Sequence, residues 1–565
     1  MKHQVPAGQL QQLLAALVDR LDQATPADIA DAMVAAAKMD QQLPAHQVQQ
    51  LAHALFQLQG DATARDVANA VWAVARLASA QRSASAQRSA PAVVRRQHHT
   101  ILQQQLVPAF LNKLSHAGPQ SISRVLLHAG LSGARLEACV VQRLLDALVA
   151  VLGAITACDI AHALLGVAAL KQRMPAGQLQ QLLGALLDRL GKAKAADIAA
   201  ALEAAAKMKQ QSPAHQVQQL IAALVKLRND AAVRDIANAV WAVVSMGRKV
   251  PLGQLQQLLH AVAGRQQQAS LSDLGKLLWA CAKSRFFPEQ LLAASRLPSA
   301  FQGAHPAALV SIAWSCGFLG HADEQLMQKL LAVVAPELTV SGSTNRAFIS
   351  SLPTLCWAVA MLDLQQHTQQ VLQMSRACSR QWHSIAAEER RQLWQAHAWL
   401  LDFQLAVGQG LHGSLIAEQL QQCADAWRYQ AQLAAKQSWG DLSSLLAAAR
   451  QLPIAWQQRP QVMGALAALY TQDMAGQGGW LGIVPDIAGK TADGVLVAVL
   501  VEHPKHFRQP DFRPTGDTQY RHRALAKREY KRMSMPINEW RKLQGDQQLE
   551  QQHLLQLFEK AGVIG

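Results

Sequence analysis

The sequence contains no apolar run that approaches the roughly 20 residues of a membrane-spanning helix. Its longest apolar stretches, such as residues 147–158, are short enough to be buried helices. It also contains no Gly-rich phosphate loop, no nucleophile elbow, no His-Glu-x-x-His motif and no protein-kinase signature. These absences argue against membrane proteins and the common nucleotide-hydrolysing, esterase and zinc-protease classes, and we expect neither a cofactor nor a metal.

Cysteine is sparse. The seven cysteines are scattered without a Cys-x-x-Cys pair, and they lie in apolar helical segments beside Leu, Ala and Trp. A zinc site or a disulfide framework needs tighter spacing. We therefore expect buried free thiols in a reducing compartment.

Clusters of β-branched residues are rare before residue 480, whereas Ala, Leu and Gln are abundant, which favours helix. At 565 residues the chain is too long for one compact core, but a solenoid can grow without limit. The net charge of +15 and the pI of about 9.7 indicate a polyanionic partner, and RNA, DNA or an anionic membrane would fit.

A block of the sequence occurs twice, because residues 6–77 return without gaps as residues 175–246. Within the blocks an Asp begins an apolar helical run every 38 residues, with one longer interval. These residues are Asp28, Asp66, Asp159, Asp197, Asp235 and Asp273. A fixed period of this length is typical of stacked helical hairpins. We predict a mainly α fold, a right-handed-type α-solenoid of ~38-residue hairpins over residues 1–360.

Each repeat is predicted to hold two helices. One begins with a capping box, such as Thr25 with Asp28, and the other follows a proline and reads PxxQLQQLLxAL in its clearest copies. The repeats also carry a tryptophan, at Trp72, Trp241, Trp279, Trp314 and Trp357. We expect these side chains to pack between adjacent repeats, and a base-stacking platform is the alternative.

The interval between Asp66 and Ser121 is one repeat plus 17 residues. The polar, basic stretch 78–98, which contains a duplicated ASAQRSA, is predicted to be a disordered insert. Residues 361–478 are interpreted as a helical continuation. The chain opens inside a repeat without a signal or transit segment, so we hypothesise that the gene model is truncated at its amino terminus.

The twin blocks differ mainly at polar positions. The first has four basic and seven acidic residues, and the second has eight basic and five acidic ones. Most of the gains cluster in the turns at or just before the capping position, at Lys192, Lys194, Lys226 and Arg228, and Lys209 replaces Asp40. Because repeats stack in register, these turns are predicted to form a basic edge that tracks a phosphate backbone. A solvated surface that has drifted in sequence is an equally open interpretation.

The pattern changes in residues 479–565, where we predict a small α/β module. Strands are expected at 494–502 and 531–536, and helices at 518–528 and 546–561. This region resembles the RAP domain in three linked motifs, at residues 501–507, 514–518 and 535–540. The resemblance implies a restriction-endonuclease-like fold.

The array resembles the octotricopeptide-type repeats of algal organelle proteins and the helical region of FAST-kinase-like proteins, whose Asn-Ala-Val-Trp-Ala-Val type of motif stands at 69–74 and 238–243. Together these resemblances imply an RNA-binding factor of the chloroplast or mitochondrial matrix. Such a factor acts in the processing, stability or translation of organelle transcripts. Its partners would be single-stranded RNA and other RNA-processing proteins.

The RAP resemblance also raises nuclease chemistry, which needs two or three carboxylates around a metal that activates water. Glu502 is the candidate catalytic residue, but Leu500 replaces the family's second acid and His503 its usual glycine. Asp486 and Asp493 lie upstream without a secure place in the motif. Glu502 could instead be a strand-end carboxylate paired with Arg508 or a backbone donor.

Residues 505–542 hold 11 basic and four acidic residues, an excess that supports phosphate contact. The candidate RNA-contacting residues here are Lys505, His506, Phe507, Arg508, Arg513, Arg521, Arg523 and Lys527. Trp540 is expected in the core of the module. The first interpretation is thus a non-catalytic RNA binder, and the alternatives are an endonuclease and a protein-binding scaffold of the HEAT or armadillo kind.

Overall fold

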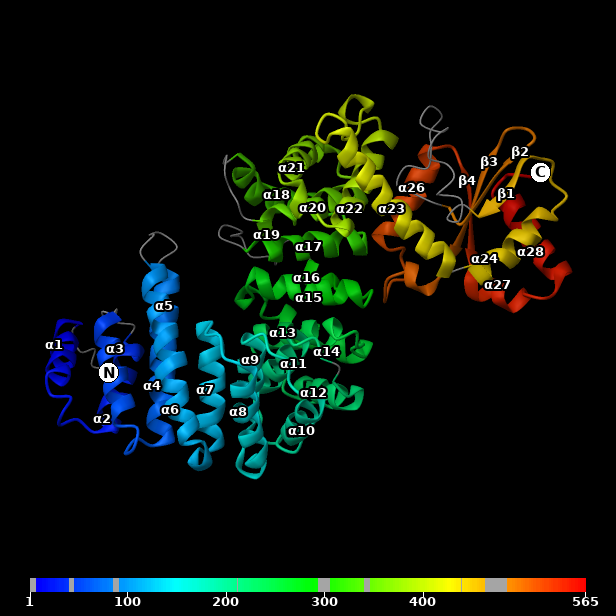
Figure 1. The fold of residues 1–565 in the computed structure, drawn as a ribbon. Coiled ribbons are helices and arrows are strands. Elements are labelled where there is room, and N and C mark those ends of the chain that lie inside the picture. Colours follow the sequence, from blue (N-terminus) through cyan, green and yellow to red (C-terminus); the bar gives the residue numbers. More distant parts are fainter. Residues whose placement is uncertain are drawn as a thin grey trace. The chain divides into compact units, whose positions relative to one another are not determined.

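The computed structural model describes residues 7–39, 45–84, 91–210, 212–292, 305–339, 346–437, 439–462 and 485–564. The chain divides into two compact units, Met1–Gly264 and Arg265–Gly565. Helices make up most of both units, and the strands of the described residues belong to one small sheet (Figure 1).

The first unit consists of two rows of helices joined by short turns. Row A holds α1 (Ala7–Val18), α3 (Ala45–Gln57), α5 (Pro91–Ile101), α6 (Val107–Asn112), α8 (Ala138–Ala150), α10 (Ala176–Leu187), α12 (Ala214–Lys226) and α14 (Leu252–Ala263). Row B holds α2 (Pro26–Lys38), α4 (Ala64–Ala84), α7 (Pro119–Ser132), α9 (Ala157–Ala169), α11 (Ala195–Lys207) and α13 (Val233–Ser245). Short helical turns are η2 (Leu102–Leu106), η3 (Leu114–His116) and η4 (Leu152–Ala154). Consecutive row B helices pack along one another, which confirms the solenoid.

Row B helices begin as the sequence predicts. In α2 the Thr25 hydroxyl accepts the Asp28 N–H at 3.3 Å, and the Asp28 carboxylate accepts the Thr25 N–H at 3.0 Å. The buried face is small and apolar, so that backbones approach closely. A Cβ on Gly166 of α9 would lie 2.4 Å from the carbonyl carbon of Leu126 in α7. Alanine and glycine at these positions therefore set the spacing of the row.

Row B helices also end alike. A left-handed residue follows each of α7, α9, α11 and α13, and the next N–H returns to a carbonyl of the last turn, as from Arg248 to Val243 O at 3.1 Å. This is the Schellman arrangement. The left-handed residues are Gly133, Lys171, Lys209 and Gly247, at intervals of 38 residues. The repeat period is thus kept in backbone conformation as well as in sequence.

Polar side chains fasten one repeat of the first unit to the next. The Gln216 amide donates to Gln180 O at 3.2 Å, and the Arg248 guanidinium donates to Ser212 O at 3.2 Å. In each of these pairs the donor lies 36 residues after its acceptor. The array is therefore held by side-chain-to-backbone bonds in register, in addition to apolar packing.

The second unit continues the helical pattern with α15 (Leu271–Lys283), α17 (Pro306–Leu319), α20 (Leu352–Met361) and α22 (Ala387–Asp402) as its row B. The other helices of its array are α16 (Glu289–Leu292), α18 (Glu324–Thr339), α19 (Arg346–Ile349), α21 (Thr368–Arg380) and α23 (Ala417–Gln437). Its helical turns are η5 (Gln266–Gln268), η7 (Gln365–His367), η8 (Trp382–Ser384) and η9 (Ala406–Gly408).

The carboxyl-terminal module is a four-stranded sheet with helices, ordered β1 (Trp456–Val462), β2 (Ile487–Thr491), β3 (Leu496–Glu502) and β4 (Lys531–Pro536). Only the β3–β4 pair is parallel, with Val499 opposite Met533. Its helical elements are α24 (Trp439–Arg450), η10 (Pro504–His506), α26 (Gly516–Lys527), α27 (Ile537–Leu543) and α28 (Gln547–Lys560). One sheet face, with α24, α27 and α28, encloses a core that contains the fully buried Trp540.

The structure changes two expectations about domains, and a third lies outside the described residues. The module includes α24 and β1, whereas the sequence placed them in the helical continuation that ends at residue 478. The expected start of the module at residue 479 lies outside the described residues. Most of the predicted disordered insert 78–98 is helical, because α4 runs to Ala84 and α5 begins at Pro91, and residues 85–90 lie outside the described ranges.

The side-chain expectations are met in part. All seven cysteines are free, but Cys139 and Cys158 are exposed rather than buried. Trp357 is buried between repeats, while the other four repeat tryptophans are only half-buried. No helix among the described residues is long and apolar enough to cross a membrane.

Candidate nucleic-acid interface

The basic residues expected along one edge of the array lie in two neighbouring turns of the first unit. Lys192 and Lys194 belong to the turn between α10 and α11, and Lys226 and Arg228 to the turn between α12 and α13. The three lysines are exposed. Arg228 is half-buried and donates to Val225 O at 2.9 Å. The arrangement therefore presents cations from successive repeats, as a phosphate-binding edge requires.

The basic residues of the module have a different environment, because residues 504–528 run across the carboxyl ends of row B in the second unit. The segment first pairs with the chain that follows α15. Gln509 N–H donates to Arg285 O at 2.6 Å, and Phe287 N–H donates to Gln509 O at 2.6 Å. The next contacts are with α17, α20 and α22 in turn.

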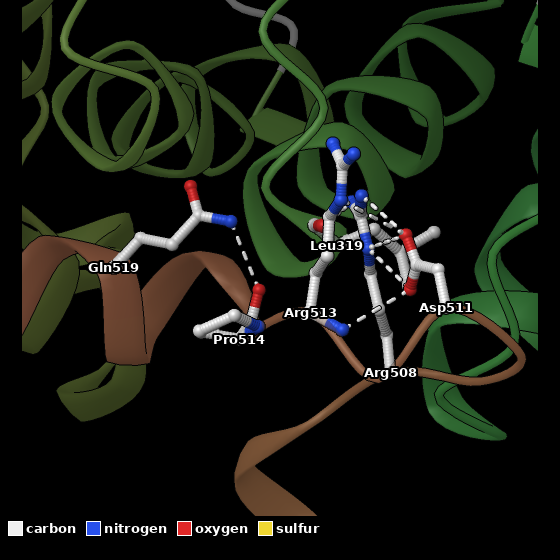
Figure 2. Close-up of polar contacts among 6 residues, drawn as sticks. All are labelled: Leu319, Arg508, Asp511, Arg513, Pro514 and Gln519. Carbon is white, nitrogen blue, oxygen red and sulfur yellow. Dashed lines mark hydrogen bonds and ion pairs between the residues drawn. The ribbon is translucent and has the colours of Figure 1, made fainter. Parts of the chain in front are cut away.

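Arg508 fills the contact with α17 (Figure 2). Its side chain is buried and donates to Leu319 O at the end of α17. It also forms a bidentate pair with Asp511, from Nε to Oδ1 at 3.1 Å and from Nη2 to Oδ2 at 2.9 Å. The guanidinium also stacks 3.8 Å from the ring centroid of Phe287. The guanidinium of Arg508 thus has protein partners on its edges and on one face. Its positive charge, which the sequence suggested for RNA contact, therefore has a structural role instead.

Helix α26 approaches α17 at backbone distance. A Cβ on Gly516 would lie 1.7 Å from Gly317 O, so only glycine fits there. The Gln519 amide donates back to Pro514 O at 2.9 Å beside this contact (Figure 2). On the same helix the Tyr520 hydroxyl donates to Gln395 O of α22 at 3.1 Å, and burial raises the pKa of Tyr520.

Arg523 and Lys527 of α26, and Arg528 directly after this helix, meet the ends of α20 and α22. Arg523 donates to Met361 O at 2.6 Å. Arg528 pairs with the buried Asp402 at 2.8 and 3.0 Å, and Lys527 lies 5.1 Å from the ring centroid of Phe403. Burial raises the pKa of Asp402 although the hydrogen bonds from Arg528 oppose this shift. The basic side chains at the end of α26 therefore mainly bind the helical array of the second unit.

The other predicted module residues are distributed unevenly. Lys505 and Arg513 are exposed, and His506 and Phe507 are half-buried. Arg521 pairs with Asp486 at 3.2 Å. The chemistry of the predicted interface is thus split between a few exposed cations and a larger group that binds protein.

Glu502, the candidate catalytic residue, lies at the end of β3. Its Oε1 accepts the Ser534 hydroxyl at 2.7 Å and lies 3.4 Å from His522 Nε2, and not beside Arg508 as the alternative interpretation held. Burial raises the pKa of Glu502, but the hydrogen bonds from His522 and Ser534 outweigh this and hold it below its ordinary value. Asp486 accepts Val501 N–H at 2.8 Å.

The described residues contain no group of three His, Cys, Asp or Glu side chains that could hold a metal ion. Both nearby carboxylates instead have protein donors. Glu502 accepts the Ser534 hydroxyl, and Asp486 accepts Val501 N–H and pairs with Arg521. Nothing in this geometry favours the endonuclease alternative over a structural role for Glu502.

Sequence reasoning missed a lysine between two repeat tryptophans. Lys283 Nζ of α15 lies 4.7 Å from the ring centroid of Trp314 and 5.7 Å from that of Trp279. Trp314 itself stacks on Phe318, with centroids 5.1 Å apart. The only signal was the tryptophan spacing, which does not identify the lysine.

No protein-family model and no curated protein sequence matches this chain. Among solved structures it is similar to a homology model of the full-length AP-3 complex in an intermediate open conformation, with 11% identity over 74% of this chain and 84% of the other, and a TM-score of 0.31. It is also similar to a circular tandem repeat protein with novel repeat topology, with 12% identity over 77% and 88% and a TM-score of 0.15. Because both TM-scores are below 0.5, no argument about this chain rests on either.

Proposed function

We propose that this chain is a non-catalytic RNA-binding factor for organelle transcripts, and that its helical array contacts single-stranded RNA. The observation that carries this proposal is the set of exposed lysines in stacked turns of the first unit, in a chain of net charge +15. Cations repeated at a fixed spacing suit a polyanion whose charges also repeat.

The carboxyl-terminal module is proposed to assist RNA binding with the few basic residues that remain exposed, and not with its whole basic helix α26. Arg508, Arg523 and Arg528 bind the array, whereas Lys505, Arg513 and Lys527 are exposed. Among the predicted residues of the module, RNA contact would therefore depend on these three. We propose that the protein acts in the chloroplast or mitochondrial matrix. Immunoblotting of purified organelle fractions tests this location.

Binding of the full chain to a fluorescein-labelled single-stranded RNA of about 30 nucleotides, followed by anisotropy at roughly 50 to 300 mM salt, tests the proposal. A protein with four to six phosphate contacts on single-stranded RNA should show a log–log salt slope of roughly −3 to −4. Absence of binding, or an affinity that salt leaves unchanged, contradicts RNA binding and favours the scaffold alternative.

The twin block supplies a variant that keeps the fold. Replacing Lys192, Lys194, Lys226 and Arg228 by the residues of the first block (K192Q, K194T, K226Q and R228Q) removes four cations from turns that already fold with Gln and Thr. We expect affinity to fall a few-fold, since these residues add attraction for the RNA.

A further inference from the structure

The first unit has a second basic edge, formed by the turns that follow α9, α11 and α13. We call it the carboxyl-side edge and define it as residues 170–175, the described residues of 208–213 (208–210 and 212–213) and 246–251. Its five basic residues are Lys171, Arg173, Lys209, Arg248 and Lys249, and none of the three segments contains an acid. Sequence analysis did not single out this edge.

The cations of the carboxyl-side edge are available to a partner. Lys171, Arg173, Lys209 and Lys249 are exposed. Arg248 is half-buried and binds Ser212 O, so it belongs to the fastening between repeats. Helices in contact are about 8–10 Å apart, so neighbouring turns present charges at intervals that an extended nucleic acid can follow.

The helix starts that follow these turns hold no acid of their own, although Asp146 of α8 accepts the Gln178 amide of α10 at 2.7 Å. Each turn leads into a row A helix, α10, α12 or α14, which starts from a proline without a side-chain cap and without an acid in its first turn. The first-turn N–H groups of a helix carry partial positive charge. The first turns here are exposed, and the space beside Gly177 and Gly253 is open.

The opposite edge, residues 188–194 and 226–232, which we call the amino-side edge, has the same number of basic residues but a different balance. It contains Asp188 and Asp230. It leads into row B helices that hold Asp197 and Asp235 in their first turn, where the Asp197 carboxylate accepts Lys194 N–H at 3.0 Å. These carboxylates would repel a phosphate at the helix starts.

One of the basic residues of the amino-side edge is also committed to the fold. Arg189 donates to Ile155 O at 2.7 Å and to Leu152 O at 2.7 Å. The two edges therefore have equal numbers of basic residues, but only the carboxyl-side edge has no acid in its own turns or in the first turns of the helices that follow them.

We propose that the carboxyl-side edge of α9, α11 and α13 binds the sugar-phosphate backbone of single-stranded RNA, while the amino-side edge adds only long-range attraction. This inference rests on the proposed function and specifies its site. The edge reads no base, so binding through it is independent of RNA sequence.

Two charge-reversal variants of the full chain test the assignment, because each changes four exposed or half-exposed cations to Glu. The carboxyl-side variant is K171E, R173E, K209E and K249E, and the amino-side variant is K192E, K194E, K226E and R228E. We expect the first to lose about 100-fold in affinity for the labelled RNA and about 3 units of salt slope, and the second to lose less than about 10-fold.

The readouts separate the two proposals. If the unaltered chain binds no RNA, the proposed function fails. If it binds but both variants lose equally, or the amino-side variant loses more, the assignment to the carboxyl-side edge is wrong while RNA binding stands. Circular dichroism reports whether each variant folds, and a milder set (K171G, R173Q, K209G and K249Q), which relieves the left-handed strain at residues 171 and 209, should still lose about 10-fold.

Discussion

The carboxyl ends of row B helices have different neighbouring residues in the two units. In the first unit they are followed by exposed cations of the same turns, such as Lys171 and Lys209. In the second unit the same kind of helix end, again closed by left-handed residues such as Arg285 and Gly320, is covered by residues 504–528. Helix carboxyl ends carry negative partial charge, so cations are favoured at both.

The difference is where the cation comes from. Arg508 and Arg523 are distant in sequence from the carbonyls that they bind, at Leu319 and Met361. A basic helix is therefore not by itself a nucleic-acid-binding helix, because the same charge can complement the helix ends of its own array. In the first unit the cations instead belong to the turns that follow the helices, as Lys171 and Lys209 do.

The largest expected effect comes from Gly516→Ala. The new Cβ would clash with Gly317 O, so α26 has to move away from α17 and uncover the helix ends. We expect a loss of roughly 3 kcal/mol in the stability of the second unit. Faster hydrogen exchange over residues 504–528 and a lower Tm would be observed. Gly413→Ala is the control, because nothing lies within 4 Å of its Cβ position, and an equal effect of both variants would contradict the docked arrangement.

A smaller effect is expected from pH. Burial first, and then the charges of Arg521, His503 and Lys505, lower the pKa of His506 to about 3. Below the unfolded value of about 6.5 the unfolded state binds a proton that the folded state refuses, so stability falls as pH drops from 6.5 toward 3.

At pH 4.5 this difference is worth roughly 2 kcal/mol. Hydrogen exchange of residues 504–528 should therefore quicken between pH 7 and pH 4.5, after correction for the intrinsic exchange rate. In His506→Gln this acceleration should be smaller, whereas exchange in α11 of the first unit should be the same in both proteins. An unchanged acceleration in the variant would show that His506 has no part in it.

The smallest effects concern the open helix ends of the first unit. Lys209 and Gly247 both adopt left-handed conformations, with φ of 53° and 70°. Lys209→Gly should stabilise the end of α11, and Gly247→Ala should destabilise the end of α13, each by about 1 kcal/mol. Hydrogen exchange at these turns, measured at increasing urea concentration, reports the stability change in each variant. Changes of the same sign in the two variants would contradict the Schellman arrangement.

Local signals predicted the repeat well. Thr25 with Asp28 and Ser270 with Asp273 form the expected capping boxes, and β4 has the expected bounds, because caps and short strands depend on neighbouring residues. The prediction failed for β1, whose polar sequence WQQRPQV gives no strand pattern and which becomes a strand through pairing with β2.

The candidate site was harder to predict than the fold. Sequence identified Arg508 and Arg523 as cations but not their partners, since those partners are backbone carbonyls in another part of the chain. It likewise pointed to the turns with Lys192 rather than to those with Lys171, because Lys171, Arg173 and Lys249 lie outside the twin blocks that were compared. The structure shows that Asp188 and Asp197 lie in the same turn as Lys192 or directly after it, at one edge of the array.

The sequence alone determined the helices, their 38-residue period and their caps, because these depend on contacts within a few residues or one repeat. Only the tertiary structure decided which cations face solvent and which bind the array. Charge is a property of a residue, but its availability depends on desolvation and on partners that the chain brings together from far apart.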